Sequence, residues 1–169
     1  MRTVKPALIS LLLIAFATAA TAGEFRKGAT VAFLGLTFLD TSTEGAYNSA
    51  RQDETARLAL LEDEVRRQFT DQGLTLVDLA PIAAELESTS NPANCYGCEL
   101  RMARKLGADY VLVGVVQKVS NLILAMNLVM RDVSTKQVVA ARVVEIRSNT
   151  DESWLRGMRY ILKTAFFTP

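Results

Sequence analysis

The sequence contains no histidine among its 169 residues. Histidine is the side chain whose unperturbed pKa lies nearest neutral pH, so its absence removes the most common general base. Ser-His-Asp triads, Cys-His nucleophile pairs and histidine-based zinc sites are therefore excluded. Acid–base chemistry would have to rest on carboxylates, lysine, tyrosine or cysteine. No constellation of these residues indicates a catalytic site, so we expect that the protein is not an enzyme.

The chain also lacks an excess of one charge and a glycine-rich phosphate-binding pattern. Lysine and arginine number 19 and the acidic residues 18, for a net charge of +1. This balance gives no electrostatic case for a nucleic-acid partner or an anionic membrane. Gly35, Gly45 and Gly73 are isolated and form no phosphate-binding loop. We expect no cofactor and no metal.

The start of the sequence has the pattern of a secretory signal peptide. A short basic segment, residues 1–5, precedes an apolar and small-residue run, residues 7–20, and an A-x-A site that ends at Ala22. That order is the signature of export, and the run is shorter than the roughly 20 residues of a spanning helix. No cysteine lies near the cleavage point, so we expect no lipid anchor there. We predict cleavage near Ala22, a periplasmic protein without a membrane anchor, and a single domain over residues 23–169.

Hydrophobic periodicity and turn residues predict an α/β (α+β) fold with a single mixed five-stranded sheet flanked by helices. Strands are predicted at residues 30–39, 74–78, 109–119, 122–133 and 137–147. Helices are predicted at residues 53–70, 81–86, 95–106 and from Asn149, where Asn149-x-x-Glu152 resembles a capping box. The order is β-α-β-α-α-β-β-β-α. Helical crossovers favour parallel pairing of the first three strands, and short turns favour an antiparallel C-terminal meander.

The only two cysteines, Cys95 and Cys98, are the sharpest candidate site. In an exported protein a cysteine pair is usually oxidised, and residues i and i+3 at a helix start are close enough to bridge. We favour a structural disulfide that pins the 88–94 loop to the following helix. A redox pair is the alternative, because a helix N-terminus lowers the pKa of the leading thiol. A metal site is the weakest interpretation, because two thiolates without histidine need a carboxylate.

Two polar groups are candidates for an interaction surface. The first shares one face of the fourth strand, opposite an apolar face that begins at Leu122, and consists of Asn121, Asn127 and Arg131. The second shares a face of the final helix and consists of Arg156, Arg159 and Lys163. Such a basic face is usually solvated and occasionally docks an acidic partner. The 41–49 loop follows the first strand, and the carboxyl end of a parallel strand is a common place for a site.

Two stretches resemble a known group of periplasmic domains. Residues 103–114 read Ala-Arg-Lys-Leu-Gly-Ala-Asp-Tyr-Val-Leu-Val-Gly, and residues 131–139 read Arg-Asp-Val-Ser-Thr-Lys-Gln-Val-Val. Together they resemble the amino-terminal domain of TolB and the related CsgG and LpoB-like domains, in which a helix ends in Leu-Gly-Ala-Asp and a later strand enters an Asp-x-x-Thr-Gly turn. Lys136 stands where those domains usually have glycine. The resemblance covers roughly residues 30–167 and implies a mixed α/β domain.

A closer resemblance is to a family of small secreted proteobacterial proteins of unknown function. It is carried by Asn94-Cys-Tyr-Gly-Cys98 and by residues 118–124 and 149–157. The resemblance implies a periplasmic domain without enzyme activity, since such relatives work mainly as assembly or binding modules. The pore-forming insertions and the lipid-anchor cysteine of the CsgG exporter are absent, so secretion through this protein is not expected.

The function that we favour is an exported, non-enzymatic binding or assembly module that acts through a sheet edge or a helical face on a protein partner of the cell envelope. A second hypothesis is a periplasmic thiol–disulfide redox protein that uses Cys95 and Cys98. A third is an accessory carrier for an exported dehydrogenase, which only export and the loop placement support.

Overall fold

The computed structural model describes residues 25–47 and 51–167. The predicted signal peptide and its cleavage site near Ala22 lie outside the described residues, as does the end of the 41–49 loop. No helix in the two described ranges is both long enough and apolar enough to cross a membrane.

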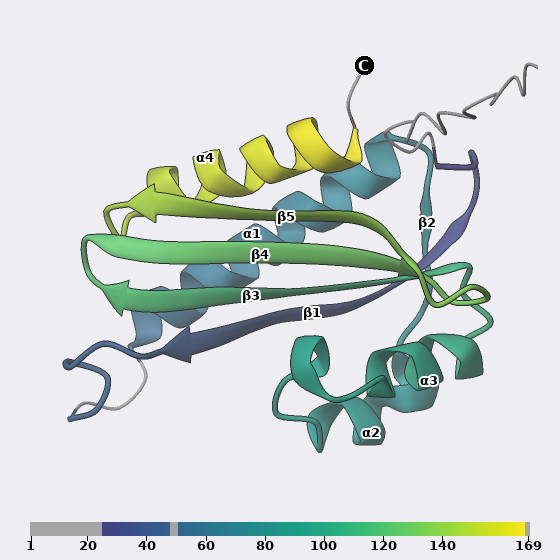
Figure 1. The fold of residues 1–169 in the computed structure, drawn as a ribbon, viewed down its shortest axis with the longest axis horizontal. Helices are drawn as coiled ribbons and strands as arrows, with labels where there is room; N and C mark the ends of the chain where they lie inside the picture. The colour runs from purple at the N-terminus through teal and green to yellow at the C-terminus, as the bar shows by residue number, and fades with distance from the viewer. Residues whose placement is uncertain (1–24, 48–50, 168–169) are drawn as a thin grey trace, which may run out of the picture.

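Five strands form one mixed sheet in the order β2-β1-β3-β4-β5 (Figure 1). Their bounds are β1 Thr30–Asp40, β2 Thr75–Leu76, β3 Tyr110–Ser120, β4 Ile123–Asp132 and β5 Val138–Arg147. β1 pairs in parallel with β2 and β3, whereas β3, β4 and β5 form an antiparallel meander. The predicted mixed sheet is therefore confirmed. Its second strand is shorter than the predicted 74–78.

The helices follow the predicted order. Their bounds are α1 Gln52–Asp71, α2 Ala83–Glu87, α3 Cys98–Lys105 and α4 Asp151–Ile161. Single helical turns precede α2 (η1, Ala80–Ile82), precede α3 (η2, Pro92–Asn94) and follow α4 (η3, Leu162–Phe166). The turn after α4 is a π turn, which shifts the apolar stripe by one residue and buries Phe166 where Ala165 would continue a regular helix.

The cap of α4 differs from the predicted capping box. Thr150, not Asn149, is the N-cap, and its side chain accepts a hydrogen bond from the Ser153 amide. Asn149 is one residue outside the helix and is free to bind elsewhere. Lys136 lies in the β4–β5 turn with φ +62°, a left-handed conformation that suits glycine.

The two faces of the sheet are covered unequally. α1 and α4 lie side by side over one face (Figure 1) and bury Leu61, Val65 and Trp154 against all the long strands. The other face carries a smaller core, in which η1 and α3 pack on β1 and β3. No residue of β5 belongs to that second core, and β4 contributes only half-buried Val129. The outer face of β4 and β5 is therefore left open.

Gly114, in the middle of β3, is a position where neighbouring groups leave no room for a side chain. A Cβ atom there would lie 2.6 Å from the Leu36 side chain and 2.7 Å from the backbone oxygen of Asn127. We expect Gly114→Ala to lower the free energy of unfolding by about 1–3 kcal/mol, as overpacked cores do. Chemical denaturation measures the loss. Adding Leu36→Ala should not restore stability, because the Asn127 oxygen belongs to the sheet; full rescue would contradict the explanation.

Candidate functional site

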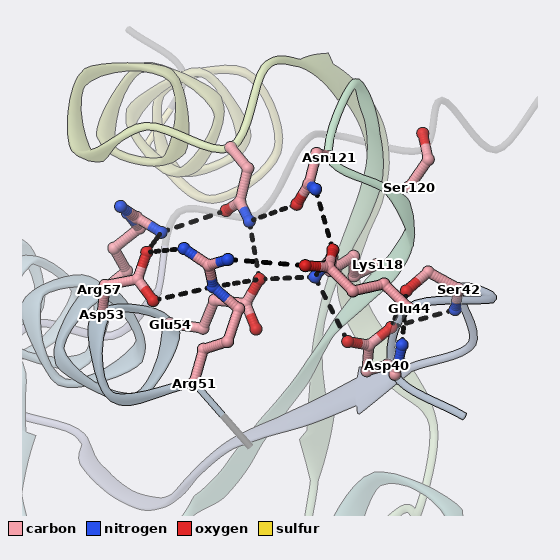
Figure 2. A network of polar contacts seen from close by, with 12 residues as sticks. Asp40, Ser42, Glu44, Arg51, Asp53, Glu54, Arg57, Lys118, Ser120 and Asn121 are labelled. Atoms are coloured by element: carbon pink, nitrogen blue, oxygen red, sulfur yellow. Dashed lines mark hydrogen bonds and ion pairs between the residues drawn. The ribbon is translucent and has the colours of Figure 1, made fainter. Parts of the chain in front are cut away.

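A buried lysine organises a polar cluster at the carboxyl ends of β1 and β3. The Lys118 side chain is fully buried, although it lies near the end of β3. Its ammonium nitrogen is 2.8 Å from Oε1 of Glu54, 3.3 Å from Oδ2 of Asp40 and 3.3 Å from Oε2 of Glu44 (Figure 2). These carboxylates come from the end of β1, the following loop and the first turn of α1. The ammonium group therefore joins three segments.

Two asparagines extend this cluster to the β3–β4 turn and to the segment before α4. Asn121 donates to Oε2 of Glu44 at 2.8 Å, and Asn149 donates to Oε1 of Glu54 at 2.7 Å. Asn149 in turn accepts a 2.9 Å hydrogen bond from the indole N–H of Trp154. The β3–β4 turn and the start of α4 are thus tied to the same carboxylates as Lys118.

The charges of the cluster stabilise one another. Burial lowers the pKa of Lys118, but hydrogen bonds from its ammonium group to Glu54, Glu44 and Asp40 outweigh burial and raise it overall. Hydrogen bonds from Asn121 and Lys118 lower the pKa of Glu44. An ammonium group has three donors, and three carboxylates occupy them. The lysine consequently has no free amine for nucleophilic or base chemistry, and the cluster acts as a structural clamp.

The sequence predicts Glu54 only as an acidic residue of a helix start and Lys118 only as part of a segment that carries the family resemblance; it does not predict that the two residues pair. The signal was present in β3, where Leu112, Val116 and Lys118 fall on the same face and are all fully buried. A lysine at a core-facing strand position requires a buried acidic partner. Glu54 is 1% exposed, but in the sequence it looks like an ordinary acidic residue of a helix start.

The cysteines lie at a second site, the disulfide corner, defined here as residues 91–99. Cys95 and Cys98 form a disulfide with a Cα–Cα distance of 5.4 Å. Between them Tyr96 has φ +54° and Gly97 has φ +89°, so the chain cannot be helical there. The predicted helix start at Cys95 is therefore wrong, and α3 begins at Cys98. The turn leaves Tyr96 97% exposed.

A buried carboxylate lies beside the disulfide. Glu99 is 5% exposed, pairs with Nη1 of Arg131 at 2.8 Å, and places Oε2 3.3 Å from Sγ of Cys95. A nearby negative charge disfavours a thiolate, whereas redox cysteines lie in electropositive surroundings. The two sulfurs and Glu99 lie within 4.8 Å of one another, but disulfide sulfurs are not thiolate ligands. The geometry therefore favours the structural interpretation of this pair, which stays a prediction.

We expect the variant with Cys95→Ser and Cys98→Ser to lose about 2 kcal/mol of unfolding free energy or less. The closed loop is very short, and the entropy that a disulfide removes from the unfolded chain grows with loop length. The test is the melting temperature of the wild type with and without reductant, compared with that of the variant. An identical melting temperature would contradict even a structural role.

The reduction potential separates the structural disulfide from the redox pair. A value below about −300 mV marks a structural disulfide, because the glutathione pool cannot reduce it. A value near those of known oxidoreductases would favour the redox hypothesis instead.

The open face of the sheet is a third candidate surface. The pairing register aligns Thr37, Val115, Asn127 and Val143 in one row across β1, β3, β4 and β5. The next row consists of Leu39, Gln117, Ala125 and Glu145. A groove of about 360 Å³ lies over these rows, and its wall is formed by Asn91, Ala93 and Asn94 of the disulfide corner. The groove is lined by aliphatic and amide side chains without a formal charge.

The first predicted polar group is not brought together. Asn121 precedes β4 and belongs to the Lys118 cluster, Asn127 lines the groove, and Arg131 pairs with Glu99 at the far end of the strand. Leu122 is 71% exposed in the turn, so the apolar face of β4 begins at Leu124.

The second predicted group is divided along α4. Arg156 is exposed and lines a groove between α4 and β5. Arg159 binds the buried carboxylate of Glu64 at 2.9 Å and so fastens α4 to α1. Burial raises the pKa of Glu64, but the guanidinium groups of Arg159 and Arg67 outweigh it and lower that pKa to about 2. Lys163 is exposed in the π turn. A role of these residues in binding stays a prediction.

Comparisons with known proteins agree with this architecture. The model of the family DUF3280, described as "Protein of unknown function (DUF2380)", matches residues 29–166. No curated protein matches the chain. The LpoB C-terminal domain from Salmonella enterica matches with a TM-score of 0.54 and 16% identity, over 76% of this chain and 90% of that chain. The LpoB C-terminal domain from Escherichia coli gives a TM-score of 0.52 and 14% identity, over 75% and 87%. These matches show a shared fold and confirm the predicted resemblance to LpoB-like domains.

Proposed function

The chain belongs to the DUF3280 family, and we propose that it is an exported, non-enzymatic module that binds a protein partner of the cell envelope. The observation that carries the proposal is the unequal covering of the sheet. Two helices close one face, whereas β4 and β5 leave the other open, with Val139 36% and Val143 62% exposed. An apolar surface of this kind, rimmed by polar residues, is typical of a protein–protein contact.

Four further observations support the proposal. The groove over the open face offers side-chain amide groups that can hydrogen-bond a polypeptide. The disulfide corner, which forms the wall of this groove, also carries the exposed side chain of Tyr96. Tyrosine is enriched among the residues that dominate binding energy. The disulfide suits an oxidising compartment, in keeping with the signal-peptide pattern. The absence of histidine supports a binding role over catalysis.

Site-specific photo-crosslinking in intact cells tests the proposal. A photoreactive amino acid replaces Val143 or Ala125 on the open face, and Ala59, exposed on α1, provides the control position. We expect the two open-face positions to capture the same envelope protein and Ala59 not to capture it. Val143→Glu in the Ala125 derivative should abolish the adduct. Equal capture from all three positions, or no adduct from the open face, would contradict the proposal.

A further inference from the structure

The two edges of the sheet differ in how they are protected. On the β1 side, β2 pairs with the first residues, Gly35 with φ +91° interrupts the strand, and the Leu36 amide donates to Oε1 of Glu62 at 2.8 Å. These are devices that prevent a further strand from adding to an edge. The β1 edge is therefore closed to a partner.

The β5 edge carries fewer of these devices: its pairing register with β4 shifts once, between the partners of Met130 and Arg131 near the start of β5, and is regular from there to the strand end. Its ten residues include no proline, glycine or lysine. Among the described residues, the one side chain that binds its backbone is Ser153, whose hydroxyl donates to the carbonyl of Arg147 at the strand end. An unpaired strand of this length is a template for another extended chain.

A basic groove follows this edge. It lies between β5 and α4, has a volume of about 520 Å³, and includes Arg142, Arg147, Arg156 and one acidic residue, Glu145. The Arg142 guanidinium stacks on the ring of Tyr160 and donates to its hydroxyl at 3.2 Å. The groove is thus positively charged on a chain whose overall charge is close to zero.

The arginines of this groove are available to a partner. Within the described part of the chain, Arg142 and Arg147 make no ion pair. Arg156 has only a 3.5 Å contact with Glu152, and both side chains are largely exposed, so this pair contributes little. Arg159, one turn of α4 away, is by contrast held by buried Glu64. Charge complementarity therefore points to an acidic occupant.

We propose that β5 accepts an extended acidic segment of a partner protein as a sixth strand. The segment hydrogen-bonds to the free backbone groups of β5, and its carboxylates pair with Arg142, which faces α4, and with Arg156 of α4. Side chains alternate between the two faces of a strand, so acidic residues at every second position would face α4, and the others would extend the open face beside Val143. This inference rests on the proposed function and names its partner class.

A second copy of this chain fits the edge less well than an acidic segment. Antiparallel pairing of two β5 strands about their middle would place the two Arg142 side chains and the two basic grooves close together. Like charges directly across strands are destabilising. The groove thus disfavours self-association and favours a segment of opposite charge.

Fluorescence anisotropy with three labelled ten-residue peptides tests the inference on the full chain without its signal peptide. One peptide alternates Glu and Val, one alternates Lys and Val, and one alternates Glu and Pro. We expect binding of the Glu–Val peptide only, because the Lys peptide has the wrong charge. The Pro peptide lacks every second backbone donor, and its proline rings fix φ away from that of a regular strand. Hydrogen exchange should show new protection of β5 amides when the Glu–Val peptide binds.

Matched variants locate the contact. Arg142→Glu should weaken Glu–Val binding at least tenfold, whereas Arg101→Glu, at an exposed arginine of α3 without an ion pair, should leave it unchanged. Circular dichroism verifies that both variants are folded. Equal binding of the Glu and Pro peptides would show charge attraction without strand addition and would overturn the inference. No Glu–Val binding at millimolar protein, equal effects of the two variants, or β5 protection that depends on protein concentration alone would overturn it as well.

The outcomes separate this inference from the proposed function. If the open face captures an envelope protein but the peptides do not bind, the binding module stands and the acidic strand is wrong. If the Glu–Val peptide binds as expected and cells yield no adduct, the edge inference stands and the envelope partner is wrong.

Discussion

Lys118→Met should lower the free energy of unfolding by about 3–5 kcal/mol, the usual cost of removing one partner from a buried ion pair. The methionine fills most of the space of the lysine side chain, so packing changes little. What changes is the charge. Glu54, 1% exposed, and its neighbours Asp40 and Glu44 would face one another without the ammonium group between them.

Denaturant unfolding followed by the fluorescence of Trp154 measures this loss. Lys163→Met, at an exposed lysine of the π turn, is the matched control and should change stability by less than about 0.5 kcal/mol. Glu54→Gln should also destabilise, since it leaves the buried ammonium group with a weaker partner. Equal stability of the Lys118 and Lys163 variants would refute the assignment of Lys118 as the centre of the clamp.

The difference in unfolding free energy between the wild type and Lys118→Met depends on pH, and the pKa shifts of Lys118 and Glu44 give the sign of that dependence. The pKa of Lys118 is raised above 10.5, so its contribution is complete below pH 10.5 and is lost as the pH rises through the folded-state pKa. The pKa of Glu44 is lowered below 4.5, so its contribution is present above pH 4.5 and is lost as the pH falls through the folded-state pKa. The wild type and Lys118→Met should therefore differ most between about pH 5 and pH 10 and converge outside that window.

Local patterns were sufficient to predict most of the fold. Leu61, Val65 and Phe69 recur at helical spacing, and the structure buries all three against the sheet. The strands of the meander were predictable because short turns force antiparallel neighbours. These features depend on residues that are close in the sequence, where periodicity reports burial directly.

The candidate site depended on contacts that local patterns do not encode. Glu54 and Lys118 are 64 positions apart in the numbering and meet only because β1 and β3 are adjacent in the sheet. Asn149 resembled an N-cap, but tertiary contacts with Glu54 and Trp154 hold it outside the helix. The start of α3 was mistaken because Tyr96 adopts a left-handed conformation that is uncommon for a non-glycine residue.

Two of the segments that carry the family resemblance meet in the structure. Residues 118–124 and 149–157 lie far apart in the sequence, yet they supply Lys118, Asn121, Asn149 and Trp154 to one cluster. Two of the three segments that carry the resemblance therefore serve the clamp that fixes the sheet ends. The third, residues 94–98, forms the disulfide corner beside the open face.

Trp154→Ala should cost about 3–5 kcal/mol of unfolding free energy, the range for removing a large aromatic side chain from a core. Trp154 is fully buried, with its ring centroid 5.8 Å from that of Phe38. Its indole N–H also binds Asn149, which in turn binds Glu54. The substitution thus opens a cavity and releases one arm of the Lys118 clamp.

Trp154→Phe separates these two effects, because phenylalanine keeps most of the apolar volume and loses the hydrogen bond to Asn149. Combined with Lys118→Met in a double-mutant cycle followed by circular dichroism, it should show a coupling energy of about 0.5–3 kcal/mol, as residues in one hydrogen-bond network do. The cycle of Leu155→Ala with Lys118→Met, at a half-buried neighbour on α4, should be additive. Additivity in both cycles would mean that Trp154 stabilises the core alone. Coupling confined to the first would show that core and clamp form one cooperative unit.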